Sequence, residues 1–457
     1  MGVRPWEIGI CGTFDVANYG DLLFPLIAES ELTERLGPLT LHRFSYNAKT
    51  PPDWPYAVTS VTALPGMIDR LDGLLIGGGF LIRFNKDVAP GYCPPTPEIH
   101  HPTGYWLSPA LIALQHDVPV MWNAPGTDGN DIPKWANPLL EIALTLSRYV
   151  AVRDEPSRCM LETLTSAPVA VVPDTAFGLP RLLNLEAAPS AEFTRLCEAS
   201  GLRGPYIVVQ ARPELEGFIR FIKNSPKRFQ NFQFLALPIG PGLGDRTETI
   251  DADLPGLVRL PCWPTPLGVA ELIGRAEAVV AQSYHLCITA ISSGVPVFTR
   301  HNLPAIKYSV LRRFDGVFDL PPNGQPDIEW FLARVGRTTP SAAARATYQP
   351  LSDHWDRIAA ALLAEPASTR PKLEHFWQSL PALLEDAAMR EVEPRDWLDG
   401  VARQLTVARA ETAAQEARIA EIHASISWKL TAPLRFVGRR IGYSGGASGN
   451  GARRRLL

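Results

Sequence analysis

The sequence feature that most constrains the fold is a repeated alternation of short apolar runs with helix-like stretches. Runs such as Glu7–Gly12, Leu39–Ser45 and Gly73–Ile76 are short, and an amphipathic stretch, Asp21–Leu36, separates the first two. Short apolar strands that alternate with helices are typical of a parallel sheet covered by helices on both faces. The first part of the chain is therefore predicted to form an open α/β sheet.

The same pattern restarts after a stretch rich in Leu, Ala and Pro, Leu183–Ser190. We interpret this stretch as a linker, although a surface loop would have the same composition. Further strand-like runs follow, including Tyr206–Gln210 and Ala278–Ala281. At 457 residues the chain is too long for one compact core. The sequence predicts two Rossmann-like halves with a ligand-binding cleft between them.

The predicted N-terminal domain covers residues 1–182, and the second Rossmann-like domain covers 191–340. A helical region, 341–395, follows. In residues 396–441 apolar side chains recur every three or four positions and then give way to basic ones, which predicts a long amphipathic helix with a basic tail. The last residues, 442–457, are rich in Gly and Ser at first and are predicted to be disordered.

The composition narrows the class of protein. A net charge of −3 gives no argument for nucleic-acid binding. Six cysteines are widely spaced, which favours buried free thiols in a reducing compartment, and no spacing of His, Cys, Asp and Glu predicts a metal site. We find no signal-peptide core and no apolar run long enough to span a membrane. These features favour a cytoplasmic protein.

Two loops in the first half are candidate binding elements. The loop after the first strand carries Asp15, Asn18 and Asp21 and leads into a helix, whose free N–H groups suit an anion or a hydroxyl-rich ligand. Asp21 is expected to cap that helix, and these residues could equally serve only the turn and the cap. The next loop contains three successive glycines, among them Gly78 and Gly79, which let the backbone approach a ligand closely.

Charged and titratable residues follow later strands. Arg153 comes directly after Tyr149–Val152 and could hold a phosphate or carboxylate, or could merely pair with Asp154 to fix the turn. Asp174 is expected to be a structural cap. In Gln282–His285 a buried strand leads into the start of a helix, where an imidazole suits general acid–base chemistry. A half-buried histidine that holds a loop is the alternative.

Five of these motifs, in this order, resemble the polysaccharide pyruvyl transferase family over about residues 7–300: NYGD, DGLLIGGG, VRDEPS, VPDTAF and QSYHLCITAISSGVPV. The resemblance implies a two-domain, GT-B-like α/β fold, to which the composition after residue 340 adds a C-terminal helical extension. It implies transfer of a pyruvyl group from phosphoenolpyruvate to sugar hydroxyls of a cell-surface polysaccharide or its precursor, forming a ketal. Phosphoenolpyruvate is then the donor substrate and no separate cofactor is implied.

By this resemblance, His285 corresponds to the histidine of the phosphoenolpyruvate site and is the proposed acid, with Ser283 and Tyr284 in the same motif. Many relatives carry arginine where this chain has Ser283. The phosphate charge would then be met by Arg153 or Arg212.

The mechanism also needs a base for the hydroxyl of the acceptor. Asp15 or Asp21 is assigned to take the hydroxyl proton of the acceptor. The substrate-binding residues are expected to include Asn18, Gly78 and Gly79.

A second resemblance lies near the C-terminus. Ala424–Arg435 is similar to an element that follows helical stretches in bacterial polysaccharide glycosyltransferases. Apolar and basic side chains stand beside one another there, so residues 396–441 are expected to contact an anionic membrane surface or a partner glycosyltransferase, with packing on the protein itself as the alternative. Two other functions stay open on the sequence: a GT-B glycosyltransferase that uses a nucleotide sugar, and a non-catalytic scaffold in polysaccharide assembly.

Overall fold

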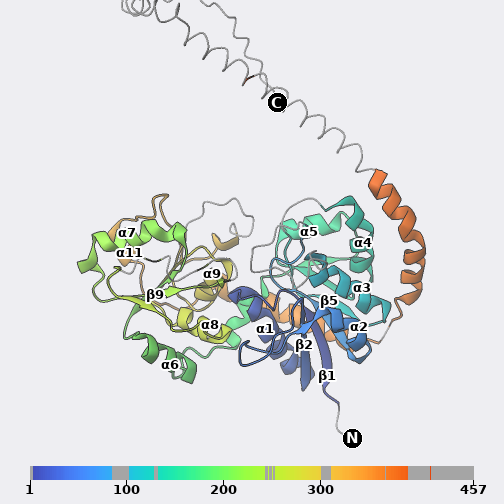
Figure 1. Ribbon diagram of the computed structural model, residues 1–457, viewed down its shortest axis with the longest axis horizontal. Coiled ribbons are helices and arrows are strands. Elements are labelled where there is room, and N and C mark those ends of the chain that lie inside the picture. Colours follow the sequence, from blue (N-terminus) through green and yellow to red (C-terminus); the bar gives the residue numbers. More distant parts are fainter. Residues whose placement is uncertain are drawn as a thin grey trace, which may run out of the picture. The chain divides into compact units, whose positions relative to one another are not determined.

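The computed structural model describes residues 4–84, 102–127, 132–241, 245, 250, 253–299, 310–365, 367–389 and 412. Contacts between residues group 1–384 into one compact unit and 385–457 into a second. The first unit contains two parallel sheets with their helices, which confirms the predicted α/β fold class. Figure 1 shows the elements of the first sheet in blue to teal and those of the second in green to yellow.

The first sheet has the strand order β3-β2-β1-β4-β5-β6-β7, and all neighbouring strands are parallel. Its strands are β1 (Trp6–Cys11), β2 (Leu39–Ser45), β3 (Thr59–Ser60), β4 (Gly73–Ile76), β5 (Val120–Trp122), β6 (Tyr149–Val152) and β7 (Val169–Val171). The direction of winding reverses between β1 and β4. In open α/β sheets such a reversal is where loops diverge and ligands bind.

The helices of this half follow the strands in alternation. They are α1 (Tyr19–Leu36), α2 (Leu64–Met67), α3 (Leu107–Gln115), α4 (Asn137–Leu146) and α5 (Glu155–Glu162), with a 3₁₀ segment η6 (Thr175–Arg181) after β7. The expectation that Asp21 caps the first helix is wrong. The helix begins at Tyr19 with Asn18 as its N-cap, so Asp21 lies inside the first turn.

The second sheet repeats this topology with the order β10-β9-β8-β11-β12-β13. Its strands are β8 (Tyr206–Gln210), β9 (Gln233–Leu237), β10 (Leu257–Arg259), β11 (Ala278–Ala281), β12 (Val297–Thr299) and β13 (Val317–Asp319). Its helices are α6 (Ala191–Ser200), α7 (Glu216–Asn224), α8 (Pro266–Gly274), α9 (Tyr284–Ser292) and α11 (Ile328–Leu332). The winding reverses between β8 and β11, directly before α9.

After the second sheet the chain returns to the first. Helix α12 (Ala342–Arg345) leads into α13 (Tyr348–Leu363), which contacts α1 and β6. Arg148, at the start of β6, donates hydrogen bonds to the carbonyls of Ala361 and Ala364 at 2.8 and 2.9 Å. Residues 370–389 are also helical. The sequence did not predict this return.

Apart from residue 412, the predicted amphipathic helix and basic tail at 396–441 and the predicted disorder at 442–457 lie outside the described residues. Within the part of the chain that the structure describes, no helix combines the length and apolar character needed to cross a bilayer. The predicted domain limits stay predictions.

The expectation of buried thiols holds for Cys11 and Cys287, while Cys197 is half-buried. It is wrong for Cys159 and Cys262, which are exposed. In α5 the helical repeat turns Ser157 and Leu161 inward, so Cys159, which lies midway between them, faces solvent.

Candidate active site

The five sequence motifs lie at the carboxyl ends of β1, β4, β6, β7 and β11. In a parallel sheet all carboxyl ends meet at one edge, and here the loops after β1, β4 and β11 lie at the two reversals of winding. The contacts below bring residues from all five motifs together. This convergence defines the candidate active site.

The first turn of α1 lies directly against His285. A Cβ built on Gly20 would lie 2.0 Å from the imidazole Nδ1, so only glycine admits the ring at this position. Phe24, one turn further along α1, meets the same imidazole edge-on with ring centroids 5.4 Å apart. The Tyr19 hydroxyl shares a hydrogen bond of 2.7 Å with Thr289 of α9. The NYGD loop and the α9 motif therefore form one surface.

The glycine loop after β4 folds over this first turn. Gly78 and Gly79 have φ angles of +112° and +75°, which favour glycine. A Cβ on Gly78 would lie 2.4 Å from the Phe24 ring, and one on Gly79 would lie 3.0 Å from the Asp21 carboxylate. Asn18 donates a hydrogen bond to Asp21 at 2.8 Å. These predicted residues are thus neighbours, and the glycines permit the close approach.

A buried carboxylate joins the two charged motifs. Asp174, 2% exposed, lies 3.3 Å from Arg153 Nη1 and 3.7 Å from His285 Nε2 through its Oδ2 atom. Burial raises the pKa of Asp174, but His285 and Arg153 outweigh burial and hold it below the ordinary 3.8. Its Oδ1 accepts the Ala176 N–H at 3.0 Å, so the expected cap is present. The sequence missed its second role as the shared partner of Arg153 and His285.

Arg153 is buried with two unused donor atoms. Its Nε and Nη2 have no hydrogen-bond partner among the described residues, and neither has His285 Nε2, because 3.7 Å exceeds a hydrogen-bond length. Unmet buried donors cost about 1–3 kcal/mol each, which favours a ligand that can accept from them. The guanidinium also lies 5.5 Å from the Phe80 ring centroid and 5.4 Å from that of Tyr284. These rings favour a cation that is held in place.

Burial lowers the pKa of Arg153, but Asp174, Tyr284 and Asp154 raise it, and the balance lies above the ordinary value for a guanidinium. The guanidinium is therefore charged. The predicted pairing with Asp154 joins Arg153 Nε to Asp154 Oδ2 at 3.5 Å, while Asp154 Oδ1 caps α5 by accepting the Ser157 N–H at 2.9 Å.

Asp15 lies in a different setting. Its carboxylate accepts hydrogen bonds from Ser45 Oγ at 2.6 Å and from Asn47, through the backbone N at 2.9 Å and Nδ2 at 2.6 Å. These bonds tie the loop after β1 to the end of β2. The structure therefore uses Asp15 to fix this loop.

Arg212 and Ser283 make contacts that the sequence did not indicate. Arg212 Nε forms an ion pair of 2.8 Å with Asp245. The Ser283 backbone N donates to Gln210 Oε1 at 2.9 Å, and the Ser283 side chain does not cap α9. The sequence did not indicate Gln210 or Asp245, because neither residue belongs to a recognisable motif.

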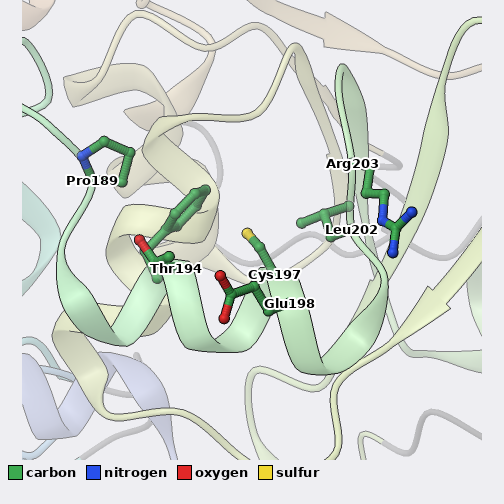
Figure 2. Close-up of a pocket in the computed structure, with 7 residues that line it drawn as sticks. Pro189, Thr194, Cys197, Glu198, Leu202 and Arg203 are labelled. Atoms are coloured by element: carbon green, nitrogen blue, oxygen red, sulfur yellow. The ribbon is translucent and has the colours of Figure 1, made fainter.

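A pocket of about 300 Å³ lies elsewhere, on α6 (Figure 2). Figure 2 shows Thr194, Cys197 and Glu198 along the helix, with Leu202 and Arg203 beyond its end. It includes none of the predicted site residues. Over the described part of the chain, no group of three or more His, Cys, Asp or Glu side chains is arranged to hold a metal ion.

Several solved structures are similar to this chain. UDP-GlcNAc 2-epimerase from Neisseria meningitidis bound to UDP-GlcNAc is 14% identical, with 78% of this chain and 99% of that chain covered and a TM-score of 0.47. The UDP-GlcNAc 2-epimerase from Methanocaldococcus jannaschii is 11% identical, with coverage of 76% and 98% and a TM-score of 0.47. E. coli heptosyltransferase WaaC with ADP-2-deoxy-2-fluoro heptose is 13% identical, with coverage of 72% and 99% and a TM-score of 0.37. Likeness at this level says nothing about the ligand or activity of this chain.

Among curated proteins, no sequence matches the chain. The family model for polysaccharide pyruvyl transferase matches residues 18–299, a span that includes or overlaps each of the five motifs gathered at the candidate site. Because this match covers more than half of the 457 residues, the chain belongs to the polysaccharide pyruvyl transferase family.

Proposed function

We propose that this protein transfers the pyruvyl group of phosphoenolpyruvate to two hydroxyls of a sugar in a cell-surface polysaccharide or its precursor, forming a ketal. Membership of the family supports polysaccharide modification as the broad function. The observation that carries the finer proposal is the arrangement of Arg153 and His285 around one oxygen, Oδ2, of the buried Asp174, at 3.3 and 3.7 Å. It combines an anion-binding cation with a titratable group.

Phosphoenolpyruvate presents a phosphate and a carboxylate, and both are acceptors of hydrogen bonds. Nε and Nη2 of Arg153, which make no hydrogen bond among the described residues, are two donors of one planar guanidinium, the geometry that binds an oxyanion at two points. The start of α9, next to His285, adds the positive end of a helix dipole. We assign the phosphate or the carboxylate of phosphoenolpyruvate to the space between Arg153 and the start of α9. Arg212 Nε forms an ion pair with Asp245. A contact of Arg212 with phosphoenolpyruvate stays a prediction.

The chemistry begins with a proton. His285, as the imidazolium, gives a proton to the methylene carbon of phosphoenolpyruvate, and the carbon that bears the phosphate becomes electrophilic. Asp174 stabilises the imidazolium before transfer and orients the ring. An acceptor hydroxyl then bonds to the electrophilic carbon and loses its proton.

Phosphate leaves with the electrons of its C–O bond, and a second hydroxyl of the sugar adds to the same carbon. One hydroxyl proton replaces the proton given by His285 and the other leaves with the phosphate, so the products are the ketal and inorganic phosphate. Of the two carboxylates assigned as the base, we favour Asp21. It accepts a hydrogen bond from Asn18 and lies beside Gly79 in the site, whereas the hydrogen bonds of Asp15 tie its carboxylate to Ser45 and Asn47 at the end of β2.

The proposal is tested by incubating the purified protein with phosphoenolpyruvate and free or lipid-linked oligosaccharides. Release of phosphate that requires the acceptor, and loss of that release in a folded His285→Ala variant, would support it. A thermal shift with a nucleotide sugar and none with phosphoenolpyruvate would favour the glycosyltransferase alternative. No shift with either donor would favour the scaffold.

Cytoplasmic location belongs to the proposal, since phosphoenolpyruvate is a cytoplasmic metabolite. Contact of residues 396–441 with a membrane surface or a glycosyltransferase stays a prediction, because this segment lies outside the described residues except at 412.

A further inference from the structure

Gln210, the last residue of β8, is hydrogen-bonded to the connection between β11 and α9. Its side chain is 2% exposed, and its Oε1 accepts hydrogen bonds from the backbone N–H groups of Gln282 at 2.8 Å and Ser283 at 2.9 Å. These are the two residues directly before α9. Since β8 pairs with β11, the neighbouring strand fixes the point at which the His285 helix begins.

A buried carboxylate sets the direction in which the Gln210 amide faces. Asp245, 3% exposed, accepts from Gln210 Nε2 at 2.8 Å through Oδ2, and its Oδ1 pairs with Arg212 Nε at 2.8 Å. An ionised carboxylate only accepts hydrogen bonds, so the NH₂ group of Gln210 must face it. The amide oxygen is thereby directed at the start of α9. Arg212 balances the buried charge.

Asp245 is also connected to His285 indirectly, through the loop after β9 and the first turn of α1. Asp245 Oδ2 also accepts the N–H groups of Ile239 at 3.1 Å and Gly240 at 3.2 Å, which fixes the loop after β9. The Ile239 carbonyl in turn accepts the Tyr19 N–H at 2.9 Å. The next residue, Gly20, is the one on which the His285 ring lies.

We propose that Gln210 and Asp245 are positioning residues for His285, and that Arg212 acts as the counter-ion of Asp245. The inference rests on the proposed function, in which His285 is the acid. The two routes hold the start of α9 and the backbone surface beneath the imidazole in one fixed relation. A displacement of about 1 Å at a reacting group can cost about 100-fold in rate, so this network sets kcat.

The first test compares Gln210→Met with Gln233→Met. Gln233 is a matched control in β9, since its amide also bonds two backbone groups: it accepts from the Arg203 N–H and donates to the Gly201 carbonyl at 3.0 Å. For phosphate release, Gln210→Met should lower kcat by about 10- to 100-fold and change the KM for phosphoenolpyruvate less than about threefold. Gln233→Met should leave both unchanged. Wild-type kcat in Gln210→Met, or an equal loss in the control, would overturn the proposal.

Hydrogen exchange provides a readout that needs no donor. The amides of Gln282 and Ser283 should exchange at least about tenfold faster in Gln210→Met than in the wild type, and at the wild-type rate in Gln233→Met. Unchanged exchange would overturn the positioning role. If the wild type released no phosphate from phosphoenolpyruvate, the proposed function would fail, and exchange alone would decide whether Gln210 holds the start of α9.

Arg212→Met separates the two roles of that arginine and serves if Gln210→Met does not fold. If Arg212 acts as the counter-ion of Asp245, Arg212→Met should lower kcat with little change in the KM for phosphoenolpyruvate. A rise in the KM for phosphoenolpyruvate with kcat unchanged would show direct binding of the donor and would overturn the counter-ion role.

Discussion

Replacement of Asp174 by Asn tests the charged centre of the site. The substitution removes the negative charge shared by Arg153 and His285 but keeps a side-chain oxygen that can accept the Ala176 N–H, so the cap of η6 can persist. Two unit charges 3.7 Å apart interact by about 4 kcal/mol in an effective dielectric of about 20. Since about 1.4 kcal/mol corresponds to tenfold in an equilibrium constant, loss of the whole interaction would reduce the population of the charged acid, and with it kcat, by at most about 1000-fold. We expect a loss of about 100- to 1000-fold.

The assay is continuous detection of phosphate released from phosphoenolpyruvate in the presence of the acceptor, with thermal unfolding measured in parallel. Unfolding matters because an unpaired buried Arg153 can cost about 3–5 kcal/mol of stability. Asp327→Asn is the matched control, because Asp327 caps α11 through the Trp330 N–H at 2.8 Å and is exposed. A folded Asp174→Asn variant with wild-type kcat would refute the assigned role.

Three further predictions follow from single contacts. Gly20→Ala forces a Cβ to within 2.0 Å of the His285 imidazole and should lower kcat by at least about 100-fold, whereas Gly66→Ala, with nothing within 4 Å, should leave phosphate release unchanged; equal activity of the two variants would contradict the packing. Arg153→Lys removes the two unused donors and should raise the KM for phosphoenolpyruvate by about tenfold or more, so an unchanged KM in a steady-state assay would exclude Arg153 as the anion-binding group. Burial, with Arg357 and Arg35, lowers the pKa of His354 from 6.5 to about 3, so the unfolded chain takes up the proton at a higher pH than the folded chain. The free energy of unfolding should therefore fall by up to about 1.4 kcal/mol per pH unit from pH 6.5 towards pH 3. Urea unfolding at pH 7 and pH 5 measures this dependence, which should be weaker in His354→Gln, and an equal dependence in both proteins would contradict the prediction.

Much of the fold could be predicted because apolar periodicity is a local property. The strand Tyr206–Gln210 was located to the residue, and β1 differs from prediction by one residue at each end. The start of α1 was misplaced because an acidic residue in the first turn resembles a cap, while the true N-cap, Asn18, bonds to Asp21 and leaves the backbone uncapped. The return of α13 to the first sheet depends on packing between distant segments, and no local sequence pattern predicts it.

For the site, the sequence located the loops and not their partners. His285 and Arg153 were singled out by their places at strand ends, but the bridging role of Asp174 depends on the pairing of β6 with β7 and on the approach of α9. The ion pair of Arg212 Nε with Asp245, 33 residues further along the chain by their numbers (245 − 212), was not predicted. A contact between a strand end and a remote loop leaves no spacing pattern in the sequence.

The central claim is pyruvyl transfer from phosphoenolpyruvate through His285. It is tested most directly by following phosphate release and the acceptor together, for the wild type and for a folded His285→Ala variant. We expect the wild type to release phosphate only when acceptor is present, the acceptor to gain a pyruvyl ketal visible by mass and by its methyl resonance, and His285→Ala to do neither. Ketal formation at the wild-type rate by His285→Ala, or no reaction of phosphoenolpyruvate with any oligosaccharide acceptor, would contradict it.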